Sequence, residues 1–190
     1  MTPARSAVTI EVSARRVGAW AWLEGCLYEV LGGWVASAGA PSAKVYFDAA
    51  SQHHAWRAQL WRERLPARLA TDPVIDLARP PTPGAEAAMK TLAGLEGDAS
   101  RLAAYGRVVL ARLVVGYRDG LAHCSAAADR PVARVLAIAV ADVLGDWQEG
   151  ARLLVEVVEG PGGGQALEDA ARSALEVEQA LIARPGGASA

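Results

Sequence analysis

One carboxylate, Glu24, interrupts the apolar stripe of the first long helical pattern in this chain of 190 residues. It stands three residues before Leu27 and seven from both Val17 and Leu31, so helical geometry places it among these side chains. A buried carboxylate without a partner is costly, and it therefore needs a counter-charge or a raised pKa. Two interpretations stay open: Glu24 is a metal ligand or acid/base group, or it forms a structural ion pair with an arginine.

Two adjacent histidines, His53 and His54, lie on the apolar side of the second helical pattern. A single histidine on such a face is more often a hydrogen-bonded core residue than a ligand, whereas two that face a buried carboxylate favour a functional site. The sequence leaves open whether one of them contacts Glu24. If chemistry occurs here, Glu24 and His54 are the predicted acid/base pair.

Aromatic and acidic residues supply the other candidate positions. Trp20 and Trp61 fall on core stripes, where tryptophan either fills the core or lines a pocket for a flat organic ligand. Of three acidic residues on the last long pattern, only Asp146 is predicted to lie near the core boundary, with Asp142 and Glu149 outside it. The predicted ligand-binding residues are Trp20, His53, Arg57, Trp61, Tyr117 and Asp146.

The elements that must position these residues are helices. Apolar residues at helical spacing predict long helices at 13–37, 42–65, 85–127 and about 131–159, followed by a shorter one at 165–183. The third pattern contains glycines and is expected to be kinked at Gly94–Gly97. No segment alternates in the way a strand does, so the fold class is all-α.

A proline-rich stretch, 66–84, separates the second and third patterns and excludes a continuous helix there. A crossover along a bundle explains a connection of this length, and it lets the second and third helices run parallel. We therefore predict an antiparallel four-helix bundle with a long crossover and an additional C-terminal helix. The domain spans 13–183, between an N-terminal arm at 1–12 and a disordered tail at 184–190.

Three glycines, Gly18, Gly25 and Gly32, repeat every seven residues along one side of the first predicted helix. Glycine inside a helix costs about 1 kcal/mol relative to alanine, so a row of three favours the close approach of another helix. That partner is either internal, such as the fifth helix, or a second copy of the chain. We expect a homodimer that uses this row or the fifth helix.

Composition excludes several classes of protein. A net charge of −2 with 52% hydrophobic residues describes a globular chain with no strong attraction to nucleic acid or to a membrane surface. The chain shows no signal-peptide pattern and no apolar run near the roughly 20 residues of a membrane span, which predicts a cytoplasmic protein. Cys26 and Cys124 lie in apolar patterns and are expected to be small core residues.

Three stretches resemble a branch of the ferritin-like superfamily from high-GC bacteria, namely RVGAWAWLEGCLYEVLGGW at 16–34, HHAWRAQLWRERLP at 53–66 and DRPVARVLAIAVADVLGDWQEG at 129–150. Di-iron and di-manganese members of this fold use a glutamate from each of two helices and a Glu-x-x-His pair from each of the other two. Glu24 matches the first-helix glutamate, but no Asp or Glu in this chain stands three residues before a histidine. The resemblance therefore implies a ferritin-like fold with a degenerate di-metal site.

Taken with the resemblance, these residues favour a bundle that binds a small organic ligand or a partner, without metal or cofactor. Arg57 would supply the positive charge that a metal supplies in relatives, and metal-independent acid/base chemistry by Glu24 and His54 is compatible with this function. One alternative is a di-iron or di-manganese oxidase with irregular ligands, Glu24, His53, His54 and Asp146. The other is an all-helical, purely structural interaction module without a pocket.

Overall fold

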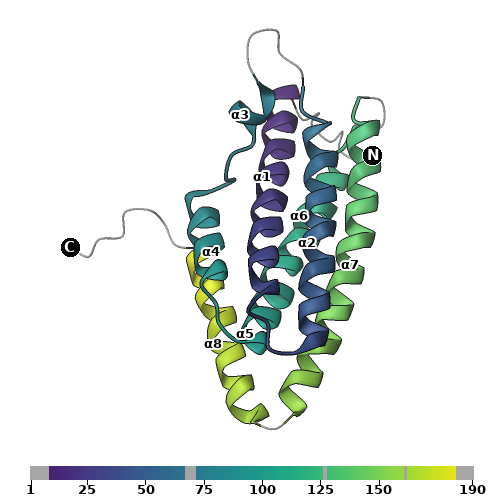
Figure 1. The fold of residues 1–190 in the computed structure, drawn as a ribbon. Helices are drawn as coiled ribbons and strands as arrows, with labels where there is room; N and C mark the ends of the chain where they lie inside the picture. Colours follow the sequence, from purple (N-terminus) through teal and green to yellow (C-terminus); the bar gives the residue numbers. More distant parts are fainter. Residues whose placement is uncertain (1–8, 67–71, 126–127, 161, 183–190) are drawn as a thin grey trace, which may run out of the picture.

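The computed structural model describes residues 9–66, 72–125, 128–160 and 162–182, which form an all-helical fold (Figure 1). Its elements are α1 (Ile10–Val35), α2 (Pro41–Arg62), α3 (Pro73–Leu77), α4 (Pro83–Ala93), α5 (Asp98–Ala103), the π-helical η1 (Ala104–Leu110), α6 (Ala111–Ala122), α7 (Arg130–Glu159) and α8 (Gly163–Ile182). Within the described residues, no helix is both long and apolar enough to span a membrane. The predicted tail at 184–190 and most of the predicted N-terminal arm lie outside the described residues.

The first helix begins earlier than its sequence pattern indicated. Thr9 caps α1, because its hydroxyl accepts a hydrogen bond from the backbone N–H of Val12 at 3.3 Å. The predicted cap, Ser13, therefore lies inside the helix, and residues 10–12 belong to α1 rather than to an N-terminal arm. Pro41 occupies the first turn of α2, where its missing N–H costs nothing, and α2 follows α1 as an antiparallel neighbour (Figure 1).

The third predicted helix, 85–127, is divided in the structure. At Gly94–Gly97 the chain reverses its direction instead of kinking, so α4 runs one way and α5, η1 and α6 return the other way (Figure 1). Gly97 has φ 74°, a left-handed backbone conformation that glycine adopts without strain. Helical spacing of apolar residues continues on both sides of this turn, which is why the sequence pattern concealed it.

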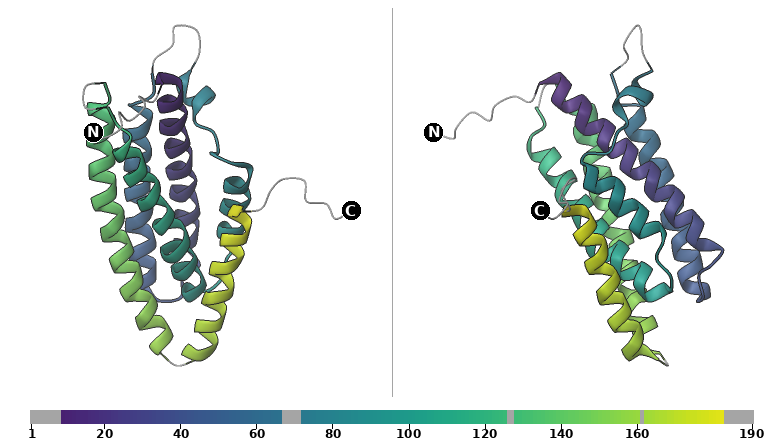
Figure 2. Two further views of the ribbon diagram at one scale, coloured as in Figure 1. Left: turned by 180° about the vertical axis from the view of Figure 1, so that it is seen from behind. Right: turned by 90° about the vertical axis from the view of Figure 1, so that its left-hand side faces the viewer.

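Four helical runs lie side by side around the centre of the molecule: α1, α2, the continuous run from α5 through η1 to α6, and α7 (Figures 1 and 2). The α5–α6 run is parallel to α2, since the connection through α3 and α4 carries the chain back along the molecule first. α7 then runs antiparallel to α6. This arrangement brings the middle of α1, α2, η1 and α7 to one level.

The C-terminal helix, α8, packs against α4, α5 and η1 rather than against α1. It buries Ala170 and Val177 on that side. Its other side leaves large apolar side chains in solvent, with Leu167 53%, Leu175 56% and Ile182 65% exposed. α8 therefore covers one flank of the core and presents an apolar outer face.

The glycine row of α1 faces elements of the same chain. A Cβ on Gly18 would stand 2.0 Å from the backbone oxygen of Leu77, so the end of α3 can lie on α1 only where this residue is glycine. A Cβ on Gly25 or Gly32 would stand 3.3 and 3.2 Å from side-chain atoms of α2. Close packing is therefore present at Gly18. The elements that face the glycine row are α3 and α2 of the same chain, and not the fifth helix, which was one of the two expected partners.

Candidate functional site

A buried arginine, Arg57, occupies the centre of the molecule between the carboxylates of α1 and α7. Its Nε donates to both carboxylate oxygens of Glu24, each at 3.1 Å. Its Nη1 donates to Asp142 and to Asp146, the latter at 3.2 Å. The ion pair with an arginine, one of the two interpretations of Glu24, is therefore present, and the same guanidinium extends it to α7.

Glu24 itself is fully buried and has three partners. Besides Arg57, it accepts hydrogen bonds from His54 Nδ1 and from the hydroxyl of Tyr117, and Trp61 Nε1 donates to that same hydroxyl at 3.3 Å. Burial by itself would raise the pKa of Glu24, but the neighbouring His54 and Arg57 and the bond from Tyr117 hold this pKa below its ordinary value. Glu24 is therefore an ionised carboxylate with its oxygens occupied.

His54 links Glu24 to a second tyrosine, Tyr105. Its Nε2 lies 2.7 Å from the Tyr105 hydroxyl, while its Nδ1 faces Glu24. An ionised carboxylate only accepts, so we assign the ring proton to Nδ1, and Nε2 accepts from Tyr105. Burial lowers the pKa of His54 against the opposing effect of Glu24, and burial raises the pKa of Tyr105 well above its ordinary value. The ring is neutral and the tyrosine protonated.

Sequence reasoning missed Tyr105. An α-helical stripe through Leu102, Gly106 and Val109 leaves Tyr105 beside the core, yet in the structure its side chain is fully buried. The reason is η1, since a π-helical stretch has wider turns than an α-helix and changes which residues face inward. No feature of the sequence marks that stretch as π-helical.

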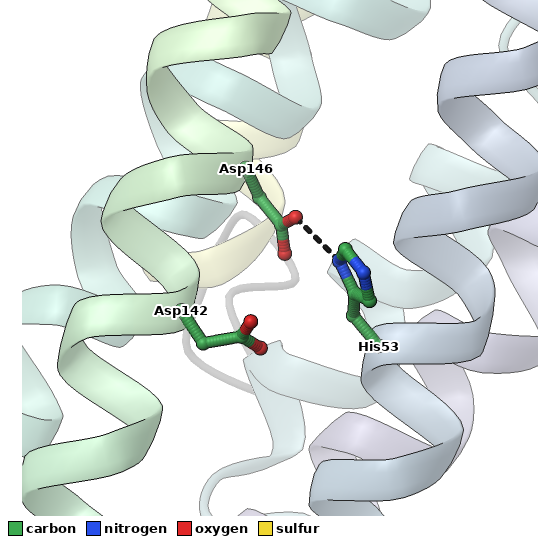
Figure 3. Close-up of side chains that lie close together, drawn as sticks. All are labelled: His53, Asp142 and Asp146. Carbon is green, nitrogen blue, oxygen red and sulfur yellow. Dashed lines mark hydrogen bonds and ion pairs between the residues drawn. The ribbon is translucent and has the colours of Figure 1, made fainter.

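A second polar group lies at the outer edge of this cluster, where α2 faces α7 (Figure 3). His53 Nδ1 stands 2.7 Å from a carboxylate oxygen of Asp146, and Asp142 lies one turn earlier on α7 (Figure 3). The side chains of Asp146, Asp142 and His53 are 6%, 27% and 46% exposed, so exposure increases from the buried cluster around Arg57 toward the solvent. Asp142 was predicted to lie outside the core boundary, and its contact with the buried Arg57 corrects that placement.

This outer group borders a groove of about 760 Å³ between α2 and α7. Part of its wall is apolar, from residues such as Val45, Ala49 and Leu153. Its charged lining is mostly acidic, because Arg152 is paired with Glu149 at 2.7 Å and with a further glutamate of α7. The polar lining residues are Tyr46, His53, Asp142, Asp146, Glu149 and Arg152.

Tyr46 fixes the position of α7 beside this groove. Its hydroxyl donates to the backbone oxygen of Asp146 at 2.8 Å. A Cβ on Gly150 would stand 2.4 Å from that hydroxyl oxygen, so glycine one turn further along α7 makes room for the ring. These contacts fix the backbone at Asp146, and they therefore fix the direction in which its carboxylate points.

The predicted aromatic residues form a packed cluster beside Glu24. The ring centroids of Trp20 and Trp61 are 4.8 Å apart, and those of Trp61 and Tyr117 are 5.6 Å apart. Trp61 and Tyr117 are fully buried, as is Arg57. Of the predicted ligand-binding residues, His53 and Asp146 line the groove, whereas Trp20 lines a different groove. The other three are buried and are not part of the lining.

The donor set does not fit the carboxylate-bridged metal pair that di-iron and di-manganese members of the ferritin-like fold hold. Such a centre takes about four carboxylates and two histidines from four helices, whereas here a guanidinium stands between Glu24 and the α7 carboxylates. A single ion at the rim fits the residues better. The ligand atoms of His53, Asp142 and Asp146 lie within 4.8 Å of one another, at the edge of the groove (Figure 3).

Comparisons of the chain with protein-family models, with curated proteins and with solved structures gave no match. Function is therefore inferred from two features of the chain itself. One is the buried cluster around Arg57, and the other is the acidic groove that opens above it.

Proposed function

We propose that this protein is a ferritin-like bundle in which Arg57 stands where relatives hold metal, and that it binds a small organic cation in the groove between α2 and α7. One observation carries this proposal. A single guanidinium contacts three carboxylates, and two of these, Asp142 and Asp146, border an open groove. The long connection before the third core run, with that run parallel to α2, supports the fold part of the proposal (Figure 1).

The charges of the groove suit a cation. Glu24, Asp142 and Asp146 contact one guanidinium, so this group carries two uncompensated negative charges whenever both neighbouring histidines are neutral. Arg152 adds no free positive charge to the lining, because it is paired with both Glu149 and a second glutamate of α7. An ammonium group near Asp142 would balance part of this excess and form charge-assisted hydrogen bonds.

The rest of the groove suits an apolar body on that cation. A volume of about 760 Å³ lies within the range of small-molecule pockets. Val45 and Leu153 contribute apolar surface, and a Cβ added at Gly145 would meet nothing within 4 Å. The chemical class of ligand is therefore an amine that carries an aliphatic or aromatic group.

Glu24 and His54 take a positioning role in this proposal. Both are fully buried, and their polar atoms are engaged by Arg57, Tyr105 and Tyr117. Acid/base chemistry at either residue requires a substrate that reaches it, and the groove residues lie between them and solvent. His53 and Asp146 are the predicted residues that contact the ligand.

Calorimetric titration with 2-phenylethylamine tests this proposal, with the neutral 2-phenylethanol as the matched probe. A charge-assisted hydrogen bond contributes roughly 1.5–3 kcal/mol, so the amine should bind at least about tenfold more tightly than the alcohol. Asp142→Asn should weaken amine binding by about the same factor, and Gly145→Leu should abolish it by filling the groove.

The matched control is Glu159→Gln, which removes a carboxylate from an exposed position of α7 outside the groove lining. It should bind the amine as the unchanged protein does. Equal affinities for amine and alcohol, or unchanged binding in Gly145→Leu, would contradict the proposal.

A second candidate function is the binding of one divalent ion at the rim. The convergence of His53, Asp142 and Asp146 favours it, because zinc accepts histidine nitrogen and carboxylate oxygen ligands together with water (Figure 3). Titration with Zn²⁺ decides between the candidates. Saturable binding at one ion per chain that is lost in His53→Ala would favour this function over the amine site.

We also propose that the chain forms a homodimer through α8. Leu167, Leu175 and Ile182 repeat at intervals of eight and seven residues, so they share one exposed side of that helix. Large apolar side chains exposed along one side of a helix are candidates for protein–protein contacts. Light scattering should show a dimer, and a monomer at high micromolar concentration would remove the proposal.

A further inference from the structure

A second groove, of about 620 Å³, lies between α1, the end of α3 with the linker that follows it, and α6. Its charged lining is the reverse of the acidic groove. Four arginines border it, and they are accompanied by one acidic residue, Asp76. The arginines are Arg15, Arg16, Arg79 and Arg112.

Two of these arginines have no acidic partner among the described residues. Arg112 and Arg16 form ion pairs with carboxylates of α8 and α6. The Nε atoms of Arg15 and Arg79, by contrast, donate only to backbone oxygens, at 3.4 and 3.5 Å. Both side chains are exposed, so their charges are open to an anion that enters the groove.

Trp20 supplies a hydrogen-bond donor that borders the same groove. Its side chain is only 8% exposed, yet its indole N–H makes no hydrogen bond among the residues that the structure describes, whereas that of Trp61 donates to Tyr117. Trp20 Nε1 stands 4.0 Å from the position that a Cβ on Gly116 would occupy, and both residues line the groove. Trp20 Nε1 is not among the buried side-chain atoms that lack a partner, so this N–H is open to the groove and can donate to an acceptor of a bound molecule.

The wall of this groove depends on a glycine. The end of α3 lies on α1 because Gly18 leaves room for the backbone of Leu77, at a distance that a side chain would exclude. Pro80 and Pro81 continue this wall, and proline restricts the backbone there. The first member of the glycine row therefore builds one side of the groove.

From these observations we infer that the groove between α1, α3 and α6 binds an organic anion, a carboxylate or sulfonate joined to a flat apolar body. The anionic group takes the N–H of Trp20 and the charges of Arg15 and Arg79. The apolar body lies against Leu23 and Leu113, which line the same groove. This site does not depend on the proposed cation site, because the two grooves are lined by different residues.

Calorimetric titration of the full chain with 1-naphthaleneacetate tests the inference, with 2-(1-naphthyl)ethanol as the neutral probe. The acid should bind at least about tenfold more tightly than the alcohol, the ratio that one charge-assisted hydrogen bond supplies. The double substitution Arg15→Gln with Arg79→Gln should remove that preference. Trp20→Phe, which keeps a ring but removes the donor, should weaken binding of the acid.

The matched control is Arg118→Gln, since Arg118 is an exposed arginine of α6 outside the groove lining. It should bind the acid as the unchanged protein does. Equal binding of acid and alcohol, equal losses in Arg118→Gln and in the double variant, or displacement of the acid by 2-phenylethylamine would each overturn the inference.

Discussion

The buried cluster around Arg57 and the rim of the acidic groove share residues but differ in their access to water. In the cluster, Glu24, His54 and Arg57 are fully buried, and their polar groups contact one another and two tyrosines. At the rim, His53 is 46% exposed and Asp142 27% exposed, beside an open groove. Asp146 belongs to both, since it contacts Arg57 on one side and His53 on the other.

Carboxylates and histidines therefore have different roles in the buried cluster and at the solvated rim. Removing one member of a buried ion pair leaves an uncompensated charge in a medium that solvates it poorly. Removing a charge at a solvated rim costs little in stability, because water takes its place. Substitutions in the cluster should therefore act on folding, and substitutions at the rim on binding.

The largest expected effect comes from Arg57→Met, which leaves Glu24 and Asp146 buried without their counter-charge. The free energy of unfolding should fall by about 3–5 kcal/mol, as for other broken buried pairs. The rim substitution Asp142→Asn should change it by less than about 1 kcal/mol in either direction. Urea unfolding measures the change in the free energy of unfolding for each variant. Equal losses in the two variants would show that the cluster and the rim do not differ in their contribution to stability.

The aromatic side of the cluster gives the next contrast. Trp61→Ala removes a fully buried ring and its hydrogen bond to Tyr117, and it should cost about 3–5 kcal/mol. Trp56→Ala, on the same helix but 46% exposed, is the matched control and should cost much less. A harmless Trp61→Ala in thermal melts would mean that α2 is rotated relative to the arrangement described here.

Acid should weaken the cluster. The pKa of His54 is lowered from an ordinary value of 6.5. Just below that pH the unfolded chain therefore binds a proton at this histidine, whereas the folded chain does not. The lowered pKa of Glu24 adds to the loss only when the pH falls further, through about 4.5 and below. Stability should therefore decline as pH falls from about 6.5 to 5, by up to about 1.4 kcal/mol per unit for this histidine.

His54→Asn separates this histidine from the two others, because the asparagine amide can donate to Glu24 but does not titrate. The variant should lose part of the slope between pH 6.5 and 5, the range just below the ordinary pKa. An unchanged slope would show that another group carries the acid sensitivity.

The smallest expected effect on stability comes from a substitution in the wall of the acidic groove. Gly145→Ala adds a methyl group that meets nothing within 4 Å on a helix, so it should stabilise the protein by up to about 1 kcal/mol. Binding of 2-phenylethylamine should weaken only slightly, in contrast to Gly145→Leu. A loss of stability in differential scanning calorimetry would show that other atoms of the protein occupy the space beside Gly145, and that the groove is not open there.

Helical periodicity was sufficient to predict the helical class and the buried position of Glu24, and it left an ion pair with an arginine as one of two interpretations of that residue. These features follow from the 3.6-residue repeat and from the cost of a lone buried charge, both of which a sequence displays. The contact between His54 and Glu24, which the pattern left open, depends on how α1 and α2 are rotated toward each other.

Other features depend on the backbone in ways that spacing does not show. The inward position of Tyr105 needs the π-helical turn of η1, and the reversal before α5 needs the left-handed conformation of Gly97. Asp142 looks like a surface residue until Arg57 reaches across from α2. The groove itself forms between α2 and α7, so no single helical pattern contains it.

Anaerobic loading with Fe²⁺, followed by removal of free metal and elemental analysis, tests whether Arg57 occupies the place of a metal pair. If Arg57 stands in the place of a metal pair, the protein should retain well below one iron per chain, show no absorption band that develops with oxygen, and melt at a temperature that chelators do not change. Two tightly held irons per chain with an oxygen-dependent band would contradict the account and favour an oxidase.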